Sequence, residues 1–451
     1  MLQKKKWSMA AVTMVTAFTM TACGGGTAQQ TQGSAEGGSA APSNAPATTA
    51  SESSNEKITI KYWYAFGGKI EEAKKHLVEE FNKSQDRIEV IAEHQGNYDD
   101  LHAKVQAALA AGNAPAVSDL EIASTGRFAR SGMIQELTAL AERDAAEVQI
   151  EDFNPGLMGN AYVDGKLYGL PFMRSTPILY KNNTMLKEAG LDPEGPRNWA
   201  ELEEYSRVLK EKGKNGLTMP ADIWFYEAFV AQSGGTVLSE DGKTATFNSP
   251  EGVEPVAFWE RLHDEGLIKI PVGNEGGATA DKDWANQLSA FKFGSTAGVT
   301  GSLEVANGAG FEMGTSFMPA NKSYGVPTGG CQLVMTSKLT DEEKEAAWEF
   351  IKFMTTKENT IYQHKHVGYL PTRLSAVETE ELQQLYKEVP HFKTAFEQLE
   401  FARPRPMENA YPEIATIIKQ AIELAILDKN VTPQQALDDA AEKANKLLSA
   451  Q

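Results

Sequence analysis

Aromatic and charged side chains that could hold a polyhydroxylated molecule recur along this chain. The aromatic candidates are Trp63, Tyr64, Phe66, Tyr98, Trp224, Phe225 and Tyr226. An aromatic ring gives the apolar face of a sugar or polyol a surface to stack on, while Asp, Glu, Arg and backbone groups bond its hydroxyls. An aromatic residue at helical spacing can equally belong to a core, so for Trp224 both interpretations stay open.

Two arginines, Arg403 and Arg405, flank a proline near the C-terminal end. A guanidinium can pair an anionic group through two parallel hydrogen bonds, so one of them could bind a charged ligand. Alternatively, both lie in a solvated loop whose surface ion pairs contribute little to stability. The sequence leaves open which arginine would face a ligand. Gly329 and Gly330 either let the backbone approach a ligand closely or simply form a turn.

Enzymatic interpretations have little support. The chain lacks a Gly-x-Ser-x-Gly elbow, a His-Glu-x-x-His zinc helix and a Walker phosphate loop. His364 and His366 are two residues apart, so on a helix they point in different directions and cannot share one metal ion. We therefore expect no catalysis, no cofactor and no metal. A secreted glycosidase remains a remote alternative, because 61 acidic residues make a pair of carboxylates inevitable somewhere.

The composition is that of a globular protein with two or three domains, since the chain has 451 residues of which 41% are hydrophobic and 23% charged. The net charge of -18 disfavours nucleic acid as a partner. Two cysteines, Cys23 and Cys331, cannot build a four-thiolate zinc site. If Cys23 carries a lipid, Cys331 is expected to be a buried, unpaired thiol.

The first residues resemble a bacterial lipoprotein leader. Three lysines at positions 4–6 precede a short apolar run at positions 9–20, and Met-Thr-Ala-Cys at positions 20–23 resembles a lipobox. We expect a signal peptide at residues 1–22 and lipid attachment at Cys23; the alternative is an ordinary secreted protein. Residues 24–56 lack Ile, Leu, Val, Met and aromatic residues, and as a flexible linker would span roughly 30 Å. The result would be a globular body tethered to a membrane surface.

The body alternates strand and helix patterns. Apolar residues alternate at Ile58, Ile60 and Tyr62, which predicts a strand, and a helical pattern follows. The predicted elements are strands at 58–64, 87–93 and 116–122 and at 179–180; helices at 70–81, 98–111 and 223–232 and from Asn198; a hairpin at Asp241-Gly242; and C-terminal helices at 341–355, 378–389, 411–427 and 432–448. Such alternation is typical of α/β folds, which bind ligands at the carboxyl ends of their strands.

Several segments together resemble a known family. They are Gly96-Asn97-Tyr98, Gly112-Asn113-Ala114-Pro115-Ala116, Pro171-Phe172, Ser175-Thr176-Pro177-Ile178-Leu179-Tyr180, Ala189-Gly190-Leu191-Asp192-Pro193 before Trp199, and Val367-Gly368-Tyr369-Leu370-Pro371-Thr372. On these segments the chain is similar to the extracellular solute-binding proteins of carbohydrate ABC importers, above all their glycerol-3-phosphate-binding branch. The resemblance covers residues 57–451.

The resemblance implies an α/β fold: a two-lobed, periplasmic-binding-protein-like clamp of type II, with mixed sheets flanked by helices and a hinged cleft. We expect lobe 1 to comprise residues 57–174 with 293–341, and lobe 2 residues 175–292 with 342–451. The resemblance and the side-chain chemistry together predict ligand contacts from Tyr98, Glu121, Ser175, Trp224, Ser302, Gly329, Gly330, Tyr369 and Arg405. Tyr369 lies in a short turn, which we expect to keep its side chain free of the core.

The implied function is capture of glycerol 3-phosphate, or of a related phosphorylated polyol or glycerophosphodiester, and delivery to ABC permease subunits. The alternative is a binding protein for a neutral sugar or oligosaccharide. Either way the expected partner is a small polyhydroxylated solute. The protein is expected to be a monomer, anchored by lipid to the outer face of the cytoplasmic membrane of a Gram-positive-type cell.

Overall fold

The computed structural model of the protein describes residues 57–273 and 275–450, all within one compact unit of the chain, Asn55–Gln451. The predicted signal peptide (1–22), lipid-attachment residue Cys23 and linker lie outside the described residues. Within the described part of the chain, every helix falls short of the length and hydrophobicity needed to span a bilayer.

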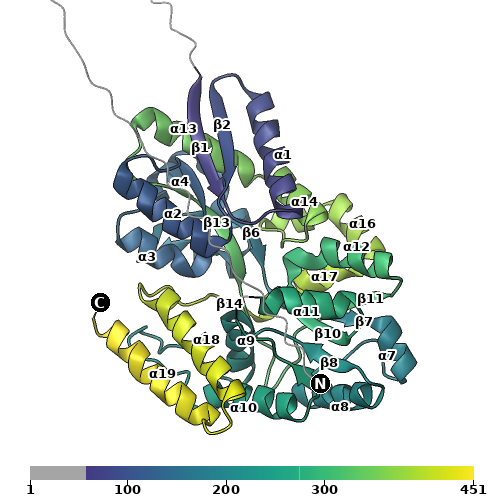
Figure 1. The fold of residues 1–451 in the computed structure, drawn as a ribbon. Helices are drawn as coiled ribbons and strands as arrows, with labels where there is room; N and C mark the ends of the chain where they lie inside the picture. Colours follow the sequence, from purple (N-terminus) through teal and green to yellow (C-terminus); the bar gives the residue numbers. More distant parts are fainter. Residues whose placement is uncertain (1–56, 274, 451) are drawn as a thin grey trace, which may run out of the picture. The chain divides into compact units, whose positions relative to one another are not determined.

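One five-stranded sheet, the first sheet, is built largely from the N-terminal part of the chain (Figure 1). Its order is β2 (Ile88–His94), β1 (Ile58–Tyr64), β3 (Val117–Glu121), β13 (Gly329–Met335), β6 (Leu170–Ser175). The first three strands are parallel, and β13 is antiparallel to both of its neighbours. Ile60, Tyr62 and Tyr64 are buried while Lys61 is exposed, which confirms the alternation predicted for β1.

The second sheet has the order β11 (Met313–Ser316), β7 (Pro177–Asn182), β10 (Ser289–Ser295), β8 (Asn215–Thr218), β9 (Ile268–Lys269). Strand β10 is antiparallel to β7 and parallel to β8. Two pairs of very short strands complete the set: β4 (Tyr162–Val163) with β5 (Lys166–Leu167), and β12 (Val326–Pro327) with β14 (Ala402–Arg403). The two mixed sheets confirm the predicted two-lobed α/β architecture.

Helices flank both sheets. Those of the N-terminal half are α1 (Lys69–Ser84), α2 (Tyr98–Ala111), α3 (Thr125–Arg130), α4 (Thr138–Arg143), α5 (Ala145–Val148), α6 (Pro155–Met158), α7 (Asn183–Ala189), α8 (Trp199–Glu211) and α9 (Ile223–Gln232). Those that follow are α10 (Pro250–Asp264), α11 (Gly276–Ala285), α12 (Val299–Ala309), α13 (Asp341–Met354), α14 (Lys357–His366), α15 (Leu374–Val377), α16 (Glu380–Glu388), α17 (Pro390–Glu397), α18 (Tyr411–Leu427) and α19 (Pro433–Leu448).

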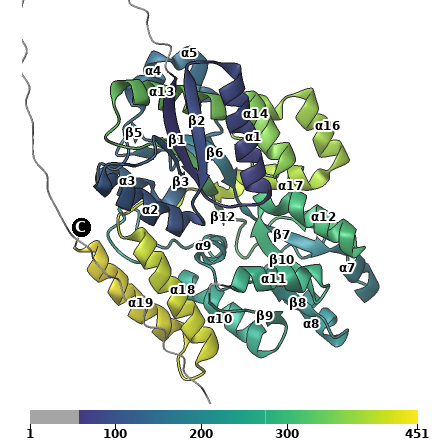
Figure 2. The same ribbon diagram turned by 45° about the horizontal axis from the view of Figure 1, so that its top comes forward.

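Local sequence signals place several of these elements. The side chain of Asn198 accepts a hydrogen bond from the Glu201 N–H at 2.9 Å, so the predicted helix start is confirmed at α8. Helices α18 and α19 lie side by side, and their apolar faces join the core of the second lobe (Figures 1 and 2). The predicted hairpin at Asp241-Gly242 forms a turn with one isolated bridge, Leu238 to Ala245, because its flanking segments do not extend into strands.

The strand pairing departs from the predicted lobe boundaries in two places. Residues 293–341 were expected in lobe 1, yet β11 pairs with β7 in the second sheet. Residues 342–451 were expected in lobe 2, yet α13 packs against β1 and β13 of the first sheet. Both lobes alternate strands and helices in the same way, so the local pattern does not distinguish them. We infer that the lobes follow the sheets, with the chain crossing between them near residues 176, 320 and 370.

Candidate functional site

Strand pairing brings four of the predicted residues to one edge of the first sheet. Cys331 lies opposite Glu121, and Gly329 lies opposite Ser175. Glu121 ends β3, Ser175 ends β6 and Gly329 begins β13, so all three reach the edge at which the parallel strands end. Tyr98 begins α2, which follows β2 at the same edge. This is where α/β sheets hold ligands.

Gly329 and Gly330 are required by close contacts. A side chain at Gly330 would place its Cβ 2.1 Å from the carbonyl oxygen of Met173, and the residue has a φ of +84° beside a register shift of β13. A Cβ at Gly329 would lie 2.5 Å from the ring of Trp224. The missing side chains therefore let the indole of Trp224 lie directly against the backbone of β13.

Trp224 is held at this position by both of its nitrogen atoms. Its backbone N–H donates to Oδ1 of Asp222 at 2.7 Å, which caps α9, and its Nε1 donates to the carbonyl oxygen of Thr328 at 3.1 Å. The residue is only half-buried, whereas the next residue, Phe225, is buried in the core. Of the two interpretations of Trp224, the structure therefore favours a ring with an accessible surface.

Arg405 is almost buried and lies between two carboxylates from distant parts of the chain. Its Nε and Nη2 donate to Glu227 of α9 at 2.9 and 2.8 Å, and its Nη1 donates to Glu121 at 2.8 Å. Tyr411 also donates its hydroxyl to Glu227. The backbone of Arg405 is fixed by Asn160, whose side chain bonds both its N–H and its carbonyl oxygen. Arg405 thus joins the end of β3 to a helix of the second lobe.

Electrostatics keep the guanidinium of Arg405 charged. Burial opposes the charge, but the carboxylates of Glu227 and Glu121 more than offset this effect, so the pKa of Arg405 lies well above its usual range. The cluster nevertheless contains two carboxylates and one guanidinium. Arg403, the other candidate, is exposed on β14. Of the two arginines, Arg405 therefore lies at this edge of the sheet, and each of its three side-chain nitrogen atoms already donates to a carboxylate.

A cavity of about 320 Å³ opens beside Trp224 on the second lobe. Two predicted residues, Trp224 and Ser302 of α12, line it, together with Asp222, Asp281 and Lys292. Nζ of Lys292 lies 2.7 Å from Oδ1 of Asp281 and 3.2 Å from Oγ of Ser302. An indole ring, carboxylates, an ammonium group and a hydroxyl in one cavity are the groups that bind polyols.

Tyr98 and Tyr369 lie near the buried thiol of Cys331. Burial raises the pKa of both phenols, and Cys331 adds to the shift in each case. Tyr98 is half-buried and its ring packs edge-on against Phe66, with centroids 4.8 Å apart. Tyr369 is only 4% exposed and belongs to the core of the first lobe. The expectation that its side chain is free of the core is therefore wrong, because the ring packs into that core. The burial predicted for Cys331 is confirmed, and within the described residues its thiol forms no disulfide.

A buried ion pair supports the edge from below. Nζ of Lys74 lies 2.6 Å from Oδ2 of Asp119 and also donates to the carbonyl oxygen of Ala65 at 2.9 Å. Asp119 in turn accepts from the Ala65 N–H and from the hydroxyl of Tyr62. Since every charge has partners, this network fixes the loop after β1 relative to β3.

Sequence reasoning missed three charged residues near the site. Arg174 is fully buried; its Nε donates to the Gly329 carbonyl at 2.9 Å, and burial lowers its pKa to about 10. Glu227 and Lys292 were also not predicted. Each of the three charged residues interrupts an apolar run, as Glu227 does between Tyr226 and Ala228. A charged residue at an apolar position is rarely buried without a partner, so this pattern in the sequence could have identified them.

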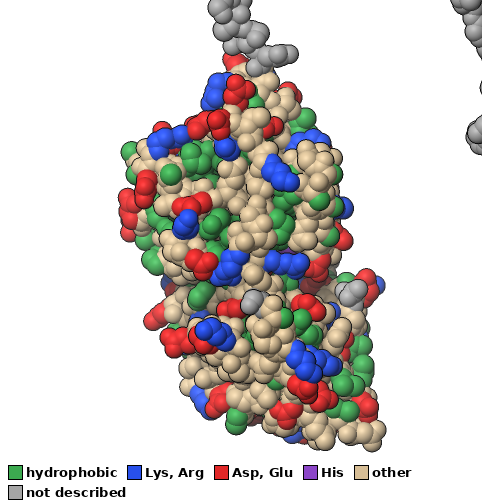
Figure 3. Space-filling model, turned by 90° about the vertical axis from the view of Figure 1, so that its left-hand side faces the viewer, with side chains coloured by type: hydrophobic (Ala, Val, Ile, Leu, Met, Phe, Trp, Pro, Cys, Tyr) green, Lys and Arg blue, Asp and Glu red, His purple; other side chains and the backbone are tan. Residues whose placement is uncertain are grey.

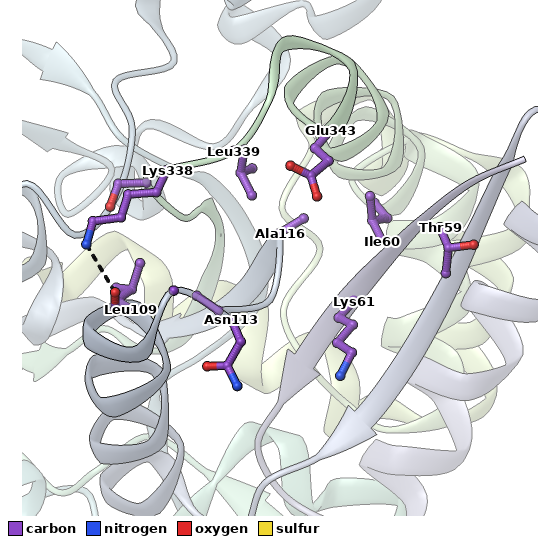
Figure 4. A pocket seen from close by; sticks show the side chains of 12 residues that line it. Thr59, Ile60, Lys61, Leu109, Asn113, Ala116, Lys338, Leu339 and Glu343 are labelled. Atoms are coloured by element: carbon purple, nitrogen blue, oxygen red, sulfur yellow. Dashed lines mark hydrogen bonds between the residues drawn. The ribbon is translucent and has the colours of Figure 1, made fainter. Parts of the chain in front are cut away.

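A second cavity, of about 350 Å³, lies in the first lobe and is lined by Thr59, Asn113, Lys338 and Glu343, among others (Figure 4). Lys338 there donates to the Leu109 carbonyl at 3.1 Å. None of the predicted ligand residues lines it.

Between residues 57 and 450, residue 274 left out, no cluster of three His, Cys, Asp or Glu side chains could hold a metal ion. Acidic and basic side chains are interspersed on the face shown in Figure 3.

Comparison with known proteins points in one direction. The model of the bacterial extracellular solute-binding protein family matches residues 76–394. The sn-glycerol-3-phosphate-binding periplasmic protein UgpB of Salmonella paratyphi A is 30% identical over 413 residues, which cover 86% of this chain and 92% of that protein. UgpB of Escherichia coli K12 is 29% identical over a similar span.

Solved structures show the same fold. The crystal structure of UgpB from Mycobacterium tuberculosis with glycerophosphocholine superposes with a TM-score of 0.78 at 25% identity, and covers 88% of this chain and 100% of that one. The GacH receptor of Streptomyces glaucescens, at 21% identity, gives a TM-score of 0.77 over 87% of this chain and 99% of its own. With this fold and a family match across most of the described residues, the chain belongs to the bacterial extracellular solute-binding proteins.

Proposed function

We propose that this protein is the substrate-binding lipoprotein of an ABC importer that captures glycerol 3-phosphate or a related phosphorylated polyol or glycerophosphodiester. One observation carries the proposal: a chain 30% identical to glycerol-3-phosphate-binding proteins gathers Glu121, Ser175, Gly329 and Arg405 from four separate segments at one sheet edge. Binding proceeds without turnover, and the protein hands the solute to permease subunits as a monomer.

The pairing of Arg405 sets a condition on this ligand. A phosphate placed beside Glu121 and Glu227 would be repelled, by roughly 4 kcal/mol per unit charge at 4 Å and an effective dielectric constant of about 20. Glu121 makes a single contact with Arg405 and its side chain is 17% exposed, against 6% for Glu227. A phosphate that binds Arg405 must therefore displace Glu121, the more easily moved of the two.

A neutral sugar or oligosaccharide is the second candidate. The pairing of Arg405 favours a neutral ligand, because its Nε, Nη1 and Nη2 atoms already donate to carboxylates. An uncharged polyol would need only the ring of Trp224 and the polar groups of the neighbouring cavity.

A binding panel separates the two candidates. Thermal unfolding is measured with glycerol 3-phosphate, glycerophosphocholine, glycerol and maltose, followed by calorimetric titration of any stabilising compound. A ligand at 100 times its Kd adds about 2.7 kcal/mol to the free energy of unfolding. We expect stabilisation by a phosphorylated compound; stabilisation by maltose alone would replace the first candidate with the second, and turnover of glycerophosphocholine would revive an enzymatic role.

The leader supports a location outside the cell. The basic residues, the short apolar run and the lipobox-like residues before Cys23 lie outside the described residues, so this part of the proposal rests on the sequence. Lipid on Cys23 would hold the protein at the outer face of the cytoplasmic membrane, with residues 24–56 as the linker.

A further inference from the structure

We propose that Lys292, and not Arg405, is the cation that binds the charged group of the ligand, so that Lys292 sets the preference for a phosphorylated over an uncharged polyol. The inference rests on the function proposed above. It starts from the unequal pairing of the two cations: Arg405 faces two carboxylates, whereas Lys292 is paired, among the described residues, with the carboxylate of Asp281 alone.

Lys292 is a buried cation with one replaceable partner. Its side chain is 8% exposed, while that of Asp281 is 69% exposed. A carboxylate that is mostly in water is hydrated when it moves away, so a ligand anion can take its place at the ammonium group at little cost. Glu227, at 6% exposed, has no such alternative once Arg405 leaves it.

The surroundings fix the position of the ammonium group. Nζ of Lys292 lies 4.6 Å from the ring centre of Trp284 and 4.9 Å from that of Tyr180, both of which are fully buried. Residue 292 also lies directly opposite Tyr180 in the pairing of β10 with β7. Two aromatic faces and a strand therefore hold the amine at the cavity wall without neutralising its charge.

The same cavity supplies the rest of a polyol phosphate site. Ser302 places its hydroxyl 3.2 Å from Nζ of Lys292, where both can donate to one phosphate oxygen. Asp222 and the half-buried ring of Trp224 line the cavity as well, and suit hydroxyl groups and a carbon chain. Groups for charge recognition and for polyol recognition thus line one cavity, and Arg405, Glu121 and Glu227 are not among its lining residues.

The test compares the affinity for glycerol 3-phosphate, by calorimetric titration, among the purified wild-type protein and four variants. Lys292→Met removes the charge and keeps the length of the side chain, and Lys292→Arg keeps the charge. Asp281→Asn removes the competing carboxylate. Lys187→Met is the matched control, because Lys187 is also paired with a single carboxylate, Glu312, but is exposed and lines no part of the cavity.

We expect Lys292→Met to weaken binding by about 10-fold or more, since it removes a hydrogen bond to a charged group. Lys292→Arg should stay within about 3-fold of wild type, and Lys187→Met should have no effect. Asp281→Asn should strengthen binding, because it removes a negative charge from the phosphate's position. A merely structural role for the Lys292–Asp281 pair predicts the opposite sign for Asp281→Asn.

Three results would overturn the inference. The first is unchanged affinity in Lys292→Met. The second is weaker binding in Asp281→Asn, which also decides the case if Lys292→Met does not fold. The third is a wild-type protein that binds no phosphorylated polyol, and only this result takes the proposed function with it; the first two leave the proposed function standing.

Discussion

At the scale of single residues, the buried charge pairs around Arg405 determine how sensitive the site is to substitution. Arg405 is shared between Glu121 of the first lobe and Glu227 of the second. Removing one member of such a group leaves the others buried and unpaired, which costs more free energy than the intact pairs contribute. The residues that hold the site together are therefore also those most sensitive to substitution.

Replacing Arg405 with Ala should lower the free energy of unfolding by about 3 to 5 kcal/mol, because Glu227 and Glu121 lose their counter-charge. The measurement is urea unfolding followed by circular dichroism. Arg403→Ala is the matched control: Arg403 is exposed two residues away, and its substitution should change stability by less than about 0.5 kcal/mol. Equal effects of the two substitutions would show that the buried charge cluster adds nothing to stability.

His364 predicts a loss of stability in acid. It is fully buried, its Nδ1 pairs with the Tyr369 carbonyl at 2.6 Å, and burial lowers its pKa to about 4. The unfolded chain, with a pKa of about 6.5, binds a proton first as the pH falls. Neutral His364 therefore contributes roughly 3 kcal/mol to the free energy of unfolding above about pH 6.5. This contribution is lost as the pH falls from about 6.5 to 4.

The stability of the wild-type protein and of His364→Phe, compared between about pH 7 and 4, tests this sign. The variant should show a shallower decline with falling pH. His366→Phe serves as the control because His366 is exposed, and it should reproduce the wild-type slope. A His364→Phe protein with the full wild-type decline would assign that decline to other groups.

At the scale of elements, the start of β13 shapes the site through its backbone. Gly330 has a φ of +84° beside the register shift of β13, and Gly329 just before it lies against the indole of Trp224. Arg174 on the neighbouring strand β6 bonds the Gly329 carbonyl. A strand end without side chains thus lets an aromatic ring from α9 reach the edge of the first sheet.

Gly330→Ala should destabilise the protein by at least about 2 kcal/mol, because a left-handed backbone and a 2.1 Å contact with the Met173 carbonyl both oppose a Cβ. Gly308→Ala provides the contrast. Gly308 lies in α12, and a Cβ added there would meet no described atom within 4 Å other than the neighbouring residues and backbone of its own helix, so the substitution should be neutral or stabilise by up to about 1 kcal/mol. Thermal unfolding of both variants measures the two effects. A Gly330→Ala protein as stable as the wild type would show that residue 330 tolerates a side chain.

At the scale of the whole molecule, polar contacts link the two lobes. The Arg405 cluster is one, and an exposed pair between Lys69 of α1 and Glu304 of α12, at 3.0 Å, is another. Exposed pairs of this kind contribute at most about 1 kcal/mol. The exposed pair is thus the weak link and the buried Arg405 cluster the strong one. In a hinged clamp, ligand binding must be able to shift the lobes, so the Arg405 cluster is the contact that such a shift would have to preserve or rearrange.

The proposed attachment to a membrane through lipid on Cys23 concerns the protein as a whole, and Cys23→Ser tests it. Without the thiol no lipid can be added, so the variant should move from the membrane fraction to the medium, measured by immunoblotting of the two fractions. Cys331→Ser is the control, since a buried thiol in the first lobe has no part in anchoring. Retention of Cys23→Ser in the membrane fraction would contradict the lipobox-like interpretation.

Local sequence signals were enough to predict most of the elements and the family. Strands such as β1 and helices such as α2 and α8 stand where periodicity and capping residues predict them, because these signals act between residues close in the chain. The short segments between residues 96 and 372 were together enough to predict the family, because they occur in the family's order along the chain. The resemblance and the side-chain chemistry together predicted Tyr98, Glu121, Ser175 and Gly329 as ligand contacts, and strand pairing brings the last three to one edge of the first sheet.

The contacts between distant side chains could not be predicted from the sequence. The partners of Arg405 lie 178 and 284 residues away, the ring of Tyr369 is taken up by the core, and Lys292 enters the cavity because β10 pairs with β7. Such contacts depend on how strands far apart in the chain assemble into sheets, and local patterns do not encode that order. The same holds for the division of the chain between the two lobes, which we infer from the strand pairing and which the local sequence pattern does not encode.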